Sequence, residues 1–265
     1  MLLKALLAAL AVGQLTTTPD AVQAQAAAAP TSVRVVPPTH RLTLDTTRLR
    51  PARLSYRTSV VKDSVASFSG EMQVVIADAQ YAGAPAWLLA QSGMQGVAMA
   101  TDSLLVSRAE LRPLHWTASR GVSRIAVEFT TDTIFGAMSS PLGRQNIVMP
   151  NRGDLLVNVA AVDLVLAALP LDIGWTDSAS VLVVDAGGSV TATATLAVDG
   201  EERVLAPAGE YDCWVVSLET ERGSARYWVS KDARVVVRSE QVLPQLGGAL
   251  LTRELLAVDS TTVPG

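Results

Sequence analysis

The sequence predicts a mostly β protein: an antiparallel curved sheet, or open β-barrel, with one lid helix at about 158–169. Three observations support this fold class. Apolar and polar residues alternate with a period of two through most of the chain, as at Met72, Val74 and Ile76. Such alternation is typical of strands with one buried and one solvent-facing side. Short turn signals separate these runs, and one segment of helical length that is apolar nearly all round lies between two β-rich halves.

The C-terminal third of the chain predicts a meander of strands joined by short turns. Asp199 and Gly200 give the strongest turn signal, because this dipeptide is typical of a two-residue hairpin. Connections this short join antiparallel neighbours, so these strands should pair in sequence order. The predicted strands are 190–198, 201–206, 211–219, 224–230, 234–242 and 249–257.

The N-terminal half predicts a similar set of strands, near 53–60, 71–78, 86–91, 96–106 and 122–130. After them, glycine and proline become frequent, and both residue types interrupt regular structure. The sequence therefore predicts an irregular loop over 136–155. Its glycines and prolines are Gly136, Pro141, Gly143, Pro150 and Gly153.

The segment 158–169 predicts a helix that begins at Asn158, a favourable N-cap residue, and ends before Pro170. Asp163 is its only charged residue, so nearly every side of the helix is apolar and must be buried. The concave face or the mouth of a curved sheet would bury it. An unpaired buried carboxylate is costly, so Asp163 should meet an arginine or point to the rim. A buried strand is the alternative, because three residues are β-branched: Val159, Val162 and Val165.

Residues 1–26 resemble a secretory signal peptide. Lys4 provides a positive charge, 5–12 form a short apolar run, and Ala24-Gln25-Ala26 fits a cleavage site. No cysteine follows the apolar run, which argues against a lipid anchor. An amphipathic first helix is the alternative. The predicted location is periplasmic or secreted, without a transmembrane segment in the mature chain.

The predicted organisation of the rest is a flexible leader at 27–42, a single β-rich domain at 43–258 and a C-terminal tail at 259–265. The net charge of −4 argues against a nucleic-acid partner, because nothing would neutralise a run of phosphates. With two histidines and one cysteine, the 265-residue chain predicts neither a transition-metal site nor a cofactor, and a hard-cation site built on loop carboxylates stays open as an alternative.

Cys213 is the single cysteine, and a nucleophilic role would need an imidazole beside it. His115 is a possible spatial neighbour, but a cysteine within a strand is usually an inert small apolar residue. We therefore expect a protein without catalytic residues. A hydrolase with an unrecognised site stays open as an alternative.

Two motifs in the C-terminal half carry a family resemblance. They are Val-Leu-Ala-Pro-Ala-Gly-Glu-Tyr-Asp-Cys-Trp-Val-Val at 204–216 and Arg-Tyr-Trp-Val-Ser-Lys-Asp-Ala-Arg-Val-Val-Val-Arg at 226–238. This pattern resembles an uncharacterised exported bacterial family called domain of unknown function thirty-one-oh-eight. The resemblance implies an architecture similar to the curved open barrel of periplasmic lipoprotein carriers, closed over by a helix. It implies no reaction.

The candidate ligand-binding residues follow from these features. Trp214 should lie on the core face of its strand, and Trp228 on the partner strand could pair with it. The candidates are Trp214, Trp228, Tyr227, Leu164 and Asp163. Packing of the aromatic residues in the core is the alternative to ligand contact.

The predicted function is that of an exported non-catalytic protein that binds a lipophilic ligand or lipoprotein in the cell envelope. Export, an apolar interior and an apolar helix over the sheet together suggest this role. An envelope structural or assembly protein, which binds another protein by a sheet edge or face, is the alternative. A large cavity lined by leucine and valine would favour the first, and a filled interior with an exposed apolar patch the second.

Overall fold

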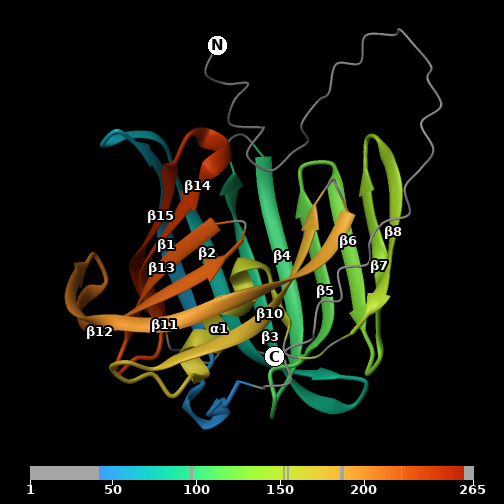
Figure 1. Ribbon diagram of the computed structural model, residues 1–265, viewed down its shortest axis with the longest axis horizontal. Helices are drawn as coiled ribbons and strands as arrows, with labels where there is room; N and C mark the ends of the chain where they lie inside the picture. The colour runs from blue at the N-terminus through green and yellow to red at the C-terminus, as the bar shows by residue number, and fades with distance from the viewer. Residues whose placement is uncertain are drawn as a thin grey trace, which may run out of the picture.

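The structure, a computed structural model, describes residues 42–95, 98–151, 153, 155–185, 188–221 and 223–259. The predicted signal peptide lies outside these residues, as do the predicted leader and tail except for one residue each. Within the described residues, the chain forms one curved, mostly antiparallel sheet of 15 strands (Figure 1). This confirms the predicted mostly β fold class.

Strands follow one another through almost the whole described chain. The first half contains β1 (Ala52–Lys62), β2 (Val65–Tyr81), β3 (Ala84–Gln95), β4 (Ala98–Ser107), β5 (Pro113–Arg120), β6 (Ser123–Phe129), β7 (Thr133–Ser140), β8 (Gly143–Pro150) and β9 (Leu155–Val157). The second half contains β10 (Thr176–Asp185), β11 (Gly188–Ala206), β12 (Gly209–Thr220), β13 (Gly223–Ser230), β14 (Val236–Leu243) and β15 (Ala249–Asp259). The helices among the described residues are α1 (Asn158–Ala168) and the short 3-10 helices η2 (Thr46–Arg48) and η3 (Pro244–Leu246).

The strand order explains why the sheet curls. Across the sheet it is β8-β7-β6-β5-β4-β3-β2-β1-β15-β14-β13-β12-β11-β10-β9. The first and last strands therefore pair at the centre, and β8 and β9 form the two ends. A flat sheet of this size would be about 65–70 Å wide. The five steps from Pro150 to Leu155 can span at most about 18 Å, so the two ends must approach each other.

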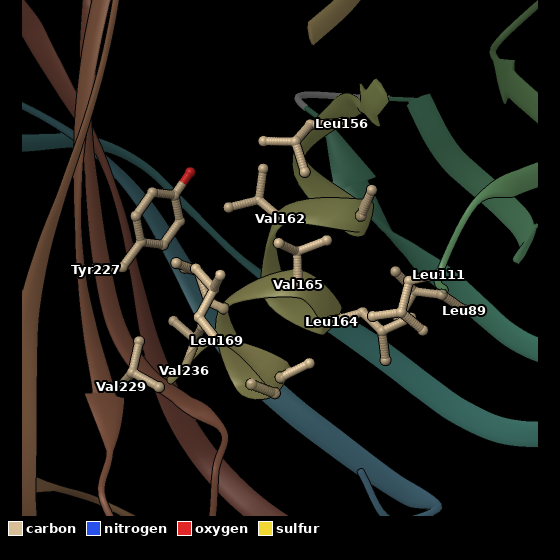
Figure 2. Packing of buried hydrophobic residues seen from close by; sticks show 14 of the residues in the cluster. Leu89, Leu111, Leu156, Val162, Leu164, Val165, Leu169, Tyr227, Val229 and Val236 are labelled. Carbon is tan, nitrogen blue, oxygen red and sulfur yellow. The ribbon is translucent and has the colours of Figure 1, made fainter. Parts of the chain in front are cut away.

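The helix α1 lies inside this curl, in contact with strands from both halves of the sheet. Figure 2 shows Leu164 directed toward Leu89 and Leu111 on one side, while Tyr227 and Val236 face the helix from the other. Apolar walls on both sides explain why the helix is apolar nearly all round, because neither side meets water. The prediction of a buried helix at about 158–169 is confirmed, and the alternative of a buried strand is wrong.

The irregular loop predicted over 136–155 is wrong over 136–150, where β7 and β8 form a regular hairpin. Gly136 is not a loop residue: a Cβ atom there would lie 2.8 Å from the Cα of Val127 on β6. This glycine allows two neighbouring strands to approach closely, which is a known role of glycine within sheets. Pro141 lies in the two-residue turn of the hairpin, and Pro150 ends β8.

The hairpin predicted at Asp199 and Gly200 is also wrong. The two predicted strands on either side are one continuous strand, β11, and the register against β12 shifts between Val198 and Gly200. The extra residue makes a β-bulge, which bends a strand without reversing it. The sequence prediction also omitted the strands β5 and β10.

Candidate functional site

A buried ion pair joins α1 to the sheet. Two nitrogens of the Arg253 guanidinium donate to the two carboxylate oxygens of Asp163, at 2.7 and 2.6 Å. Both residues are 4% exposed. Arg253 lies on β15, so the pair connects the middle of the helix to the centre of the sheet. The expectation that Asp163 meets an arginine is thus met in the interior and not at the rim.

Neighbouring side chains complete the surroundings of Arg253. Its third donor atom, Nε, bonds the Ser239 hydroxyl at 3.2 Å, and its guanidinium lies 4.7 Å from the ring centre of Tyr56. Burial is the largest single influence and works to lower the pKa of Arg253, but the charge and hydrogen bonds of Asp163, together with Tyr56 and Tyr227, raise that pKa overall. Burial also raises the pKa of the Tyr56 phenol, which donates to the Val236 carbonyl at 2.9 Å. This cluster is a satisfied structural unit that fixes α1 in place.

Trp214 takes part in fixing the C-terminal end of the same helix. The Arg234 guanidinium lies 4.5 Å from the Trp214 ring centre and donates to the Leu169 carbonyl at 3.3 Å. The backbone N–H of Asp45 donates to the Ala168 carbonyl at 2.8 Å. Two of the carbonyl groups left without partners by the end of the helix are therefore satisfied.

Trp228 lies elsewhere, and the predicted pairing of the two tryptophans is wrong. Trp214 stands opposite Val229, and Trp228 stands opposite Val215, so the two indoles point to different faces. The Trp228 Nε1 donates to Glu202 at 2.7 Å, and Arg238 lies 4.8 Å from its ring centre.

The prediction that Trp214 marks the core face of β12 is also only half right. Cys213 on the other face is fully buried, whereas Trp214 is only partly buried. The strands β11 and β12 are therefore covered on both sides near this point.

The five candidate ligand-binding residues thus do not form one site. Tyr227, Leu164 and Asp163 lie in the interior around α1, where residues 161–169 are all buried. Their role in ligand binding stays a prediction. Neither of the two hollows described for the surface is lined by any of the five residues, and the interior contacts are those of a packed core.

A hollow on the outer side of the sheet has a lining of mixed polarity. It has a volume of about 510 Å³ and crosses strands β2 to β6. Hydroxyl side chains line part of it, and because they alternate with buried core residues they face away from α1. Its apolar lining residues are Val75, Ile125 and three alanines, without a leucine, so it is not the large leucine- and valine-lined cavity expected for a lipophilic ligand. The hydroxyl residues are Ser92, Thr101, Ser103, Thr117 and Ser119.

Cys213 and His115 are not brought together. The strands β4, β3, β2, β1, β15, β14 and β13 separate their strands, β12 and β5, which stand on opposite sides of the curled sheet (Figure 1). His115 bonds Glu128 at 2.7 Å instead, and Glu128 also accepts from the Tyr81 hydroxyl at 2.7 Å. Burial raises the pKa of the Cys213 thiol from 9.0 to about 12, so the thiol is neutral near neutral pH. This arrangement gives no support to a cysteine nucleophile.

The raised pKa of Cys213 predicts a pH dependence of stability. In the unfolded chain the thiol loses its proton above about pH 9, whereas the folded protein keeps it until about pH 12. The free energy of unfolding should therefore fall between these values. Cys213→Ala should cost roughly 1 kcal/mol at neutral pH, and the gap to wild type should shrink in urea titrations between about pH 8 and about pH 11. Every other titratable residue is present in both proteins, so the gap isolates Cys213. A constant gap, or rapid thiol labelling of the folded protein, would contradict the assignment.

The β7–β8 hairpin exposes apolar residues at one end of the sheet. Among the described residues, β8 pairs with β7 on one side and with no strand on the other. Phe135 and Val148 stand opposite each other on the same face and are 43% and 75% exposed. Leu142, in the turn of the hairpin, is 83% exposed. The sequence prediction missed this surface, because it treated the segment as an irregular loop.

Two further properties concern the described part of the chain. No three His, Cys, Asp or Glu side chains gather there in a way that could hold a metal ion. None of its helices is both long enough and apolar enough to cross a membrane.

A family model matches residues 53–249, which include both motifs of the C-terminal half and most of the sheet. Its description is "Protein of unknown function (DUF3108)". The chain belongs to this family. The family resemblance inferred from 204–216 and 226–238 is therefore confirmed. The region that matches DUF3108 runs from β1 to the first residue of β15. The two strands that pair at the centre of the sheet therefore lie at the two ends of the matched region.

Two solved structures are similar to this DUF3108 chain. One is a Bacteroides fragilis NCTC 9343 protein, provisionally described as exported, with a YmcC-like fold. It is 11% identical, with a TM-score of 0.39, and the match covers 80% of this chain and 96% of that one. The other is the hypothetical lipoprotein YmcC of Escherichia coli K12, which is 14% identical with a TM-score of 0.34. That match covers 83% of this chain and 88% of YmcC. No curated protein matches the DUF3108 chain.

Proposed function

We propose that this chain is an exported, non-catalytic protein of the bacterial cell envelope that binds another protein through the free edge of β8. The observation that supports the proposal most directly is the end position of β8 in the sheet, beside exposed apolar side chains. Such an edge carries backbone N–H and C=O groups that an added strand can pair with. The role corresponds to the envelope assembly function that the sequence left as an alternative.

The composition of β8 supports an edge used for binding. Proteins usually protect exposed edges with several charges, with proline or with a covering element. Over its eight residues, β8 has one charged side chain, Arg144, and its proline lies at the last position. The apolar residues Phe135, Leu142 and Val148 are displayed beside the edge and not buried under it. Exposed apolar groups next to an open edge are typical of interaction surfaces.

A lipophilic ligand is the second candidate, and the position of α1 favours it. The helix occupies an apolar chamber between the two halves of the sheet. A lipophile of similar shape could take this place only if α1 moved out. That movement would expose 161–169 and separate Asp163 from Arg253, which makes it costly. The filled interior is the reason for ranking protein binding first.

Export is supported by the sequence alone. Lys4, the apolar run at 5–12 and the small residues Ala24 and Ala26 have the order found in secretory signal peptides. Such a peptide would direct the mature chain to the periplasm or the medium.

Native mass spectrometry of the full chain purified from its own cell envelope tests both candidates. We expect a complex with a protein partner in the wild type and its loss in Val148→Lys, because a charge there blocks apolar contact at the edge. Val122→Lys is the matched control: Val122 is 74% exposed but lies in a different hairpin turn, so the complex should persist. A bound lipid without a protein partner, or a complex that survives Val148→Lys, would contradict binding through β8.

A further inference from the structure

The outer face of β8 presents two different chemical groups at a fixed spacing. Arg144, Asn146 and Val148 stand opposite Ser139, Ala137 and Phe135 of β7 in the register of the hairpin. Alternate residues of a strand share a face, so Arg144 and Val148 lie on one face, four residues apart. That face therefore has a cationic end near the hairpin turn and an apolar end near Val148 and Phe135.

The cationic end is strengthened from the neighbouring strands. Ser139 stands between Arg144 on β8 and Arg124 on β6 in the same row. Within the described residues, neither arginine has an ion-pair partner in the structure. Glu128, which shares a face of β6 with Arg124, is already bonded to His115 and Tyr81. Two arginines on an open surface attract an anionic group.

We infer that the partner of β8 is an extended segment with an apolar residue followed, four positions later, by an acidic residue on the same face. The inference rests on the proposed function and adds the chemistry of the partner. All strand pairs of the sheet except β9–β10 are antiparallel, so the added strand is assigned the antiparallel direction. Its apolar residue then stands opposite Val148 and its acidic residue opposite Arg144.

The register of an added strand is fixed by this arrangement. A shift of one residue would turn the acidic and apolar side chains to the inner face, where Ile147 is already buried. A shift of two residues would place the acidic residue opposite Asn146 and leave Arg144 unmatched. The partner is therefore selected by charge and by spacing, and the backbone bonds add affinity without selecting sequence.

A charge-reversal experiment with two synthetic peptides tests the inference. The probes are the capped peptide Thr-Val-Thr-Thr-Thr-Glu-Thr and its counterpart with lysine in place of glutamate. Both are titrated into the full chain to millimolar concentration, with NMR shifts of the β8 amides as the signal. The glutamate peptide should bind wild type about two- to tenfold more tightly than the lysine peptide, as expected for an exposed charge pair. Arg144→Glu should reverse the preference, and added salt should reduce it.

The matched control is Arg226→Glu, an equal charge change at an exposed position on β13, which should leave the preference unchanged. Equal affinity for the two peptides, an unreversed preference in Arg144→Glu, or no binding of either peptide would overturn the inferred partner chemistry. Loss of the native protein complex in Val148→Lys would still support binding through β8 in that event. Failure of the inference is therefore distinguishable from failure of the proposed function.

Discussion

Asp163→Ala is expected to lower the free energy of unfolding by about 3–5 kcal/mol, as measured by urea unfolding. The substitution leaves Arg253 buried at 4% exposure without its counter-charge, and an arginine cannot lose its proton to escape this cost. The hydrogen bond to Ser239 and the contact with Tyr56 remain, but neither supplies negative charge. Asp163→Ala should also loosen the attachment of α1, which would appear as faster amide exchange in the helix.

A second variant separates the charge effect from general damage to the core. Asp163→Leu combined with Arg253→Met removes both charges, and this double variant should be more stable than Asp163→Ala. Asp212→Ala is the control for removal of an ion-paired aspartate, because its pair with Arg203 is exposed and should contribute little. Unfolding of Asp163→Ala at the urea concentration of the wild type would contradict a buried, unsolvated pair.

Leu164→Ala is expected to lower the free energy of unfolding by about 2–5 kcal/mol. Leu164 is 1% exposed and fills the space between α1 and the side chains of Leu89 and Leu111 (Figure 2). Its truncation removes apolar contacts and leaves a cavity that a helix held on both sides cannot close by moving.

The same substitution at an exposed leucine provides the control for Leu164→Ala. Leu142, in the turn of the β7–β8 hairpin, is 83% exposed, so Leu142→Ala should change stability by no more than about 0.5 kcal/mol. Both variants lose the same atoms, and the difference between them measures burial alone. Equal urea midpoints for the two variants would show that α1 does not pack in the interior.

The sequence was sufficient to predict those elements of the fold whose signal lies in neighbouring residues. The apolar run before Pro170 predicts α1, because a segment of helical length that is apolar nearly all round has to be a buried helix. The alternation of apolar and polar residues predicts most strands, because a strand with one buried face shows this pattern in its own sequence. The β7–β8 hairpin was missed because Gly136, Pro141, Gly143 and Pro150 act as loop signals in isolation. Gly136 is required by the approach of Val127 from another strand, and that contact is invisible along the chain.

The candidate site depended even more on partners distant in sequence. Asp163 could be expected to meet an arginine, but nothing near it identifies Arg253, 90 residues away. The pairing of Trp214 with Val229 follows from the register of the β12–β13 hairpin, which the turn residues alone do not set. The free edge of β8 depends on the order of the whole sheet, so a local pattern of residues cannot reveal it.

The seam between β1 and β15 also determines the order in which the molecule can be completed. Every other antiparallel strand pair joins consecutive strands, whereas Leu54 pairs with Val258 near the opposite end of the described chain. As a chain is synthesised from its N-terminus, β1 stays an open edge until the last strand is delivered. The strand that closes this edge also carries Arg253, so Asp163 has no counter-charge before that moment. Closure of the sheet and neutralisation of its central helix are therefore a single late event, and a chain truncated before residue 249 would lack both.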